Sequence, residues 1–108
     1  DLDSQSFWLS IGMVIMLGPA LEELLFRGAV FAAAAKMGAD AQRNPSLFAV
    51  LFSATAFTLV HPPSLWLPIF VLGLVLGCVR YHGQGVRDCI LLHIGYNSVV
   101  LFLTYPAS

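Results

Sequence analysis

The sequence predicts an all-α protein, a multi-span transmembrane bundle of about four main helices. Hydrophobic residues make up 58% of the 108 positions and charged residues 10%, against about 25% charged in typical soluble domains. The mean hydropathy is +0.84. So few charges cannot form a polar shell, which argues against the alternative of an unusually apolar soluble bundle. We expect the chain to bind the lipid bilayer and, at a net charge of −1, to bind no nucleic acid.

The first apolar stretch runs from about Phe7 to Ala35 and is interrupted at Gly18-Pro19. Proline is tolerated in the first turn of a helix, where its missing N–H would be unpaired anyway. Pro19 therefore either begins a new helix, 19–37, or kinks one long helix. In the first case Glu22 and Glu23 lie near a helix N-terminus, where the helix dipole favours carboxylates.

Three further apolar stretches follow, each shorter than the roughly 20 residues that span a bilayer. Their polar ends bring them close to that length. Ser64 is the expected N-cap of the second of these three. The stretches cover about Pro45 to His61, Ser64 to Tyr81 and Arg87 to Tyr105.

The loop charges alternate as expected for a four-span topology. Lys36 and Arg43 lie in the first loop, Arg80 and Arg87 in the third, and the second loop has no basic residue. Because cytoplasmic loops carry the excess of Lys and Arg, the first and third loops should face the cytoplasm.

The chain is expected to be one membrane-embedded domain, residues 1–108, and a fragment of a longer multi-span protein. It begins at Asp1 without a basic n-region or an initiator Met, so no signal peptide is predicted. Cys78 and Cys89 form no CxxC pair and are expected to be reduced packing residues. The oligomeric state is not predicted.

Three of the eleven charged residues occur within six positions of the first apolar stretch, as Glu22, Glu23 and Arg27. Buried charges are costly unless they are paired or used. Glu23 and Arg27 are four residues apart and can form an ion pair on one helix face. Glu22 is rotated by about 100° from Glu23, which leaves it without that partner and free for chemistry.

Two histidines and an asparagine lie on other predicted helices. His61 follows Phe57 by four residues, and His93 precedes Asn97 by four. With Glu22, they supply a general base, a proton shuttle and oxyanion donors if they meet in the bundle interior. His82 lies in a predicted turn and is given no role.

Structural roles for the same residues stay open. Glu22 could join the ion-pair network, His61 could cap a helix C-terminus, and His93 with Asn97 could link helices through hydrogen bonds. Gly73-x-x-x-Gly77 is typical of helix packing. From helix rise, His61 and Glu22 lie roughly 20 Å from the cytoplasmic loops and His93 about 10–15 Å, so their meeting requires tilt or an early start of the last helix.

Three ordered motifs resemble those of the CPBP family, the type II CAAX prenyl endopeptidases, also called Abi or lysostaphin-resistance-protein-A-like proteins. The resemblance covers about Pro19 to Leu103, although family members usually carry more spans. The motifs are Glu22-Glu23-x-x-x-Arg27, Phe57-x-x-x-His61 and His93-x-x-x-Asn97.

The resemblance implies an intramembrane endopeptidase that cleaves a membrane-associated peptide or protein, prenylated or not. It implies that Glu22 and His61 activate water and that His93 and Asn97 stabilise the oxyanion. The remaining two motif residues would be structural support, namely Glu23 and Arg27.

No cofactor is expected, although zinc is an alternative. Glu22, His61 and His93 match the His₂Glu set of catalytic zinc sites, but the sequence has no HExxH, and the resemblance favours a glutamate-dependent mechanism. Two other functions stay open: a non-catalytic membrane scaffold or immunity factor of the same fold, and a small proton-coupled transporter.

Overall fold

A computed structural model of the chain describes residues 2–104, and these residues are helical throughout apart from short turns. The expected all-α fold is confirmed. In order, the elements are α1 (Leu2–Gly12), η1 (Met13–Leu17), α2 (Gly18–Glu23), η2 (Leu24–Val30), α3 (Phe31–Asp40), α4 (Pro45–Leu59), η3 (Pro63–Leu65), α5 (Trp66–Val79), η4 (Arg80–Gln84) and α6 (Gly85–Thr104). The segments η1 and η2 have π-helical hydrogen bonding, η3 is a 3₁₀ turn, and η4 is a kink at which Gly83 leaves the helical conformation.

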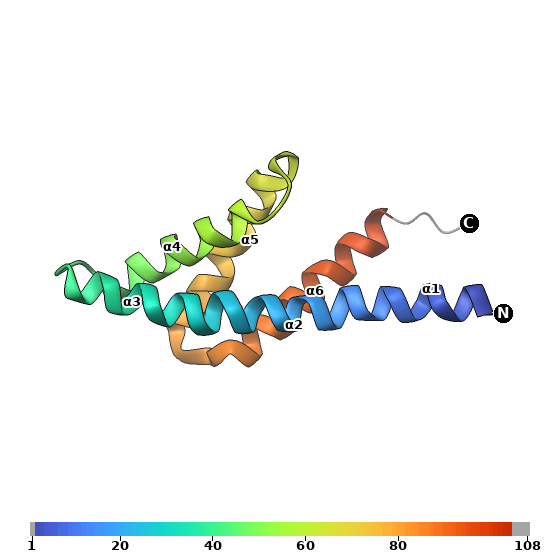
Figure 1. The fold of residues 1–108 in the computed structure, drawn as a ribbon, viewed down its shortest axis with the longest axis horizontal. Coiled ribbons are helices and arrows are strands. Elements are labelled where there is room, and N and C mark those ends of the chain that lie inside the picture. The colour runs from blue at the N-terminus through green and yellow to red at the C-terminus, as the bar shows by residue number, and fades with distance from the viewer. Residues whose placement is uncertain (1, 105–108) are drawn as a thin grey trace.

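The elements α1 to α3 form one continuous helix, drawn from dark blue to cyan in Figure 1. Pro19 does not begin a new helix, so of the two alternatives only the single long helix holds. The proline follows the π-helical segment η1, where the N–H of Gly18 donates to the carbonyl of Met13, five residues back. Such wider turns relieve a helix where the regular bonding pattern is interrupted. Glu22 and Glu23 therefore lie mid-helix, and the expected effect of a helix N-terminus does not apply.

The second predicted helix begins as its sequence indicates. The side chain of Asn44 caps α4 by accepting the N–H of Leu47 at 3.0 Å, and Pro45 occupies the first turn. The helix ends at Leu59, so His61 lies in the turn beyond it and not on the helix itself.

The boundaries of the last two predicted helices shift. Ser64 is not the N-cap of α5, because it lies inside the 3₁₀ turn η3, and Leu65 precedes the helix. The last helix, α6, begins at Gly85, two residues before the expected start at Arg87. Its expected end at Tyr105 lies outside the described residues.

Three helical stretches are long and apolar enough to cross a membrane, namely 3–40, 63–83 and 85–104. The fourth apolar helix, α4, has 15 residues and is shorter. Large apolar side chains on these helices are exposed, as on a surface that faces lipid. Residues 2–104 therefore form three candidate spans and one short helix, where four spans were expected.

Small residues let α4 pack between α3 and α5. A Cβ added to Gly38 would lie 2.9 Å from Cβ of Phe48, and one added to Gly77 would lie 3.0 Å from Cγ1 of Val50. A Cβ on Gly73 would lie 3.1 Å from Cα of Ala54. The helix-packing interpretation of Gly73-x-x-x-Gly77 is thus confirmed.

The turn at η4 reverses the chain, so that α6 packs against the long helix. Gly83 in η4 and Gly85 at the start of α6 adopt φ values of 80° and 79°, which favour glycine. Figure 1 shows α6 crossing the long helix near α2, so that both ends of the described chain lie at the same end of the molecule. This crossing brings the last motif to the first.

Candidate active site

A buried ion pair lies where α2 meets η2. Nη1 of Arg27 is 3.3 Å from Oε2 of Glu23, and both side chains are fully buried. Nη2 of Arg27 donates to the carbonyl of Gly73 on α5 at 2.9 Å, an approach that the absent side chain of Gly73 permits. The ion pair expected from the four-residue spacing is confirmed, and it ties the long helix to α5.

The same carboxylate also binds His93. Nδ1 of His93 lies 2.8 Å from Oε2 of Glu23, with both side chains buried. An ionised carboxylate only accepts hydrogen bonds, so Nδ1 carries the proton and donates it. Helix rise had placed His93 nearer the cytoplasmic loops than the first motif, but the structure brings it to the depth of Glu23. It contacts Glu23 and not Glu22.

Glu22 faces the other motif histidine. Its Oε2 lies 3.3 Å from Nε2 of His61, and the two side chains are 33% and 21% exposed, respectively. Nδ1 of His61 donates to the carbonyl of Phe57 at 2.7 Å, because a carbonyl can only accept. This bond directs Nε2 toward the carboxylate. The Glu22–His61 pair is thus partly exposed, whereas in the second pair Glu23 is fully buried and the His93 side chain is 4% exposed.

The ring of Phe57 joins the two carboxylate–imidazole pairs. Its centroid lies 4.7 Å from that of His61 and 5.7 Å from that of His93, both in edge-on geometry. The guanidinium carbon of Arg27 lies 4.5 Å above the same ring. Phe57 is fully buried. The sequence indicated Phe57 only as the residue four positions before His61. Its place between the two carboxylate–imidazole pairs was not predicted.

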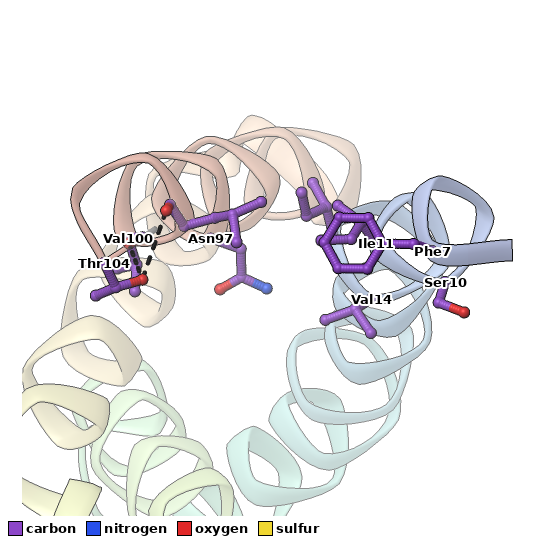
Figure 2. Close-up of a pocket in the computed structure, with 9 residues that line it drawn as sticks. Phe7, Ser10, Ile11, Val14, Asn97, Val100 and Thr104 are labelled. Carbon is purple, nitrogen blue, oxygen red and sulfur yellow. Dashed lines mark hydrogen bonds between the residues drawn. The ribbon is translucent and has the colours of Figure 1, made fainter. Parts of the chain in front are cut away.

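Asn97 lies apart from both pairs. Its carboxamide points into a pocket of 420 Å³ between α6 and the first part of the long helix, as Figure 2 shows. Within residues 2–104 it makes no hydrogen bond to Glu22, His61 or His93. The pocket is mostly apolar and is lined by Phe7, Ser10, Ile11, Val14, Ile15, Asn97, Val100, Leu101 and Thr104.

The three ligands of the zinc alternative do not come together. In the part of the chain that the structure describes, no three His, Cys, Asp or Glu side chains are placed to hold a metal ion. The two imidazoles instead face different carboxylates, His61 facing Glu22 and His93 facing Glu23. The donor set of these residues thus does not fit a three-ligand zinc site.

Two residues outside the motifs donate hydrogen bonds to the backbone of motif residues. Nε1 of Trp66 donates to the carbonyl of His61 at 2.9 Å, and Nε of Arg80 donates to the carbonyl of Arg27 at 3.0 Å. Sequence reasoning counted Arg80 only as a loop charge and did not single out Trp66. Both contacts use backbone carbonyls, which leave no sequence signal.

His82 and the two cysteines make their contacts outside the two carboxylate–imidazole pairs. His82 is exposed and stacks on Tyr81 with ring centroids 5.1 Å apart. Cys78 and Cys89 are both free, and the buried Cys89 thiol donates to the carbonyl of Leu76 at 3.4 Å.

A bundle of apolar helices that buries glutamate, arginine and histidine at its centre is typical of membrane proteins with an intramembrane polar site. The chain matches the model of the family described as type II CAAX prenyl endopeptidase Rce1-like, over residues 4–99 of 108. It belongs to this family, a family of membrane proteases, and is an integral membrane protein. Comparisons with curated proteins and with solved structures gave no match.

Proposed function

We propose that this protein is an intramembrane endopeptidase that hydrolyses a peptide bond of a membrane-associated substrate with water activated by Glu22 and His61. The observation that carries the proposal is the 3.3 Å approach of the Glu22 carboxylate to Nε2 of His61. This pair is partly exposed, whereas the neighbouring Glu23–Arg27 pair is fully buried. A reacting water needs such access, and a structural ion pair does not.

The chemistry assigned to the exposed pair follows from its tautomer. Since Nδ1–H of His61 is engaged by the carbonyl of Phe57, Nε2 is the position that can exchange a proton. Glu22 takes a proton from water as the oxygen adds to the scissile carbonyl carbon. The proton then passes, through Glu22 or Nε2 of His61, to the leaving nitrogen as the C–N bond breaks.

Two groups are proposed to stabilise the oxyanion. The carboxamide N–H of Asn97 can donate in any protonation state of the site. His93 can donate only through Nε2–H, which requires the imidazolium, because its Nδ1–H is used by Glu23. Glu23 and Arg27 are proposed as the support that fixes this imidazole.

The pocket beside Asn97 is proposed to receive the substrate segment next to the scissile bond. Its 420 Å³ volume lies within the usual range of ligand pockets, roughly 300–1,000 Å³. Apolar walls with one carboxamide suit a peptide that presents an apolar side chain and a backbone amide. The basic loops favour an active site that opens toward the cytoplasmic side.

The test is peptide hydrolysis by the detergent-purified protein, with a farnesylated CAAX peptide and its unprenylated counterpart as probes. Glu22→Gln keeps the shape and removes the base, so cleavage should fall by roughly 10²–10⁴-fold. Asp40→Asn, at the exposed end of the same long helix, is the matched control and should cleave as the wild type does. Full cleavage by Glu22→Gln would refute the mechanism.

Two further results separate this proposal from its alternatives. Cleavage should persist in the presence of a metal chelator, whereas its loss and recovery with zinc would overturn the metal-free mechanism. No cleavage by wild-type protein, together with proton flux in liposomes, would favour a transporter. No cleavage and no flux would favour a scaffold.

A further inference from the structure

Arg80 makes a contact that the mechanism above does not use. It lies half-buried just beyond α5, and its Nε–H donates to the backbone carbonyl of Arg27 at 3.0 Å. Its guanidinium carbon also lies 5.2 Å from the centroid of the Phe31 ring on α3. The side chain thus reaches from η4 onto the long helix, immediately beside the motif arginine.

The Arg27 carbonyl is available because η2 is π-helical. In a regular α-helix it would accept the N–H of Phe31, four residues on. Here that N–H donates instead to the carbonyls of Phe26 and Gly28 and bypasses Arg27. A bypassed carbonyl needs another donor, and Arg80 supplies one.

The π-helical segment η2 determines the rotation of α2, which carries Glu22, relative to α3. It places one extra residue in a turn. Removing it would rotate the half with Glu22 by about 100°, the rotation of one residue, relative to α3. Because α3 is fixed against α4 by the close approach of Gly38 to Phe48, such a rotation would take Glu22 away from His61.

We propose that Arg80 is a positioning residue: by holding the bypassed carbonyl of Arg27, it maintains the π-helical segment that aims Glu22 at His61. The kinetic part of this inference rests on the proposed peptidase function. The structural part, the hydrogen bond to the Arg27 carbonyl, does not.

Two substitutions separate the hydrogen bond from the charge. In Arg80→Gln the amide nitrogen takes the place of Nε, so the donor stays while the charge is lost. In Arg80→Met a methyl carbon takes that place, so the length stays and the donor is lost. Arg87→Met removes an exposed cation just beyond the same turn, 86% exposed beside Asp88, and is the matched control.

The hydrogen bond can be observed without any activity. Arg-Gly occurs once in the sequence, at Arg27-Gly28, so labelling arginine with ¹³C at the carbonyl and glycine with ¹⁵N gives one NMR correlation for that peptide group. The Arg27 carbonyl should show the shift of a bonded carbonyl in wild type, Arg80→Gln and Arg87→Met, and move upfield in Arg80→Met.

Peptide hydrolysis provides the second readout. Arg80→Met should lower kcat at least tenfold with KM nearly unchanged, whereas Arg80→Gln should stay within about threefold of wild type. Equal losses in the two variants would assign the effect to charge and overturn the proposal, as would an unshifted carbonyl in folded Arg80→Met. If that variant does not fold, an unbonded carbonyl shift in wild type overturns it. If wild-type protein cleaves nothing, the peptidase proposal fails while the carbonyl shift still decides the role of Arg80.

Discussion

The two adjacent glutamates should differ sharply in what they contribute to stability. Oε2 of Glu23 accepts from both Arg27 and His93, in surroundings from which water is excluded. In Glu23→Gln the carboxamide oxygen can still accept, but the charge of Arg27 is left unbalanced. The new NH₂ group would also replace Oε1, which has no partner within the described residues.

The magnitude follows from burial. Breaking a buried ion pair by removing one charge costs about 3–5 kcal/mol, so the ratio of folded to unfolded protein at a given denaturant level should fall about a hundredfold or more. Glu22→Gln alters a pair that is one-third exposed on the carboxylate side. Exposed pairs contribute about 0–1 kcal/mol, so this neighbour should stay close to wild-type stability.

The assay is unfolding of the detergent-solubilised protein by SDS titration, followed by circular dichroism. Glu23→Gln should unfold at a clearly lower SDS fraction, while Glu22→Gln unfolds near the wild-type midpoint but lacks cleavage. Equal midpoints for Glu23→Gln and wild type would refute the reasoning from burial. A larger loss for Glu22→Gln would show that the roles of the two carboxylates are reversed.

Three further predictions use single contacts. Gly77→Ala should destabilise the protein by about 1–3 kcal/mol in the same titration, because the new Cβ would be too close to α4. Gly95→Ala is the control and should not destabilise, because Gly95 has open space around it. Equal effects of the two substitutions would contradict the close packing of Gly77 on α4. Trp66→Phe removes the 2.9 Å donor to the His61 carbonyl, so kcat should fall several-fold for a stability loss of about 0.5–1.5 kcal/mol; an unchanged kcat would deny Trp66 that role. Gly83→Ala should cost about 1–2 kcal/mol, because φ is 80° there, and wild-type stability would show that the turn adjusts.

Spacing within one helix was a sound guide to contacts. The four-residue separation of Glu23 and Arg27 predicted their ion pair, and Gly73-x-x-x-Gly77 predicted close packing of α5. Composition predicted the helical membrane fold. These inferences succeed because side chains three or four residues apart share a helix face whatever the rest of the chain does.

Contacts between helices were less accessible to sequence reasoning. That His93 chooses Glu23 over Glu22 depends on the rotation of the long helix, which its π-helical segments alter. A pattern based on 3.6 residues per turn cannot show such segments. Asn97 shares a face with His93 by spacing, yet it lies one turn further along and meets the pocket beside α1.

The length of the first helix has a consequence for how the protein sits in lipid. Its 38 residues extend about 57 Å at 1.5 Å per residue, nearly twice the roughly 30 Å hydrocarbon thickness of a bilayer. Even a steep lean of about 40° would accommodate only about 26 residues. About a dozen residues must therefore overhang the hydrocarbon layer, as a rod that reaches into the headgroups or beyond. Glu22 lies close to the midpoint of that rod.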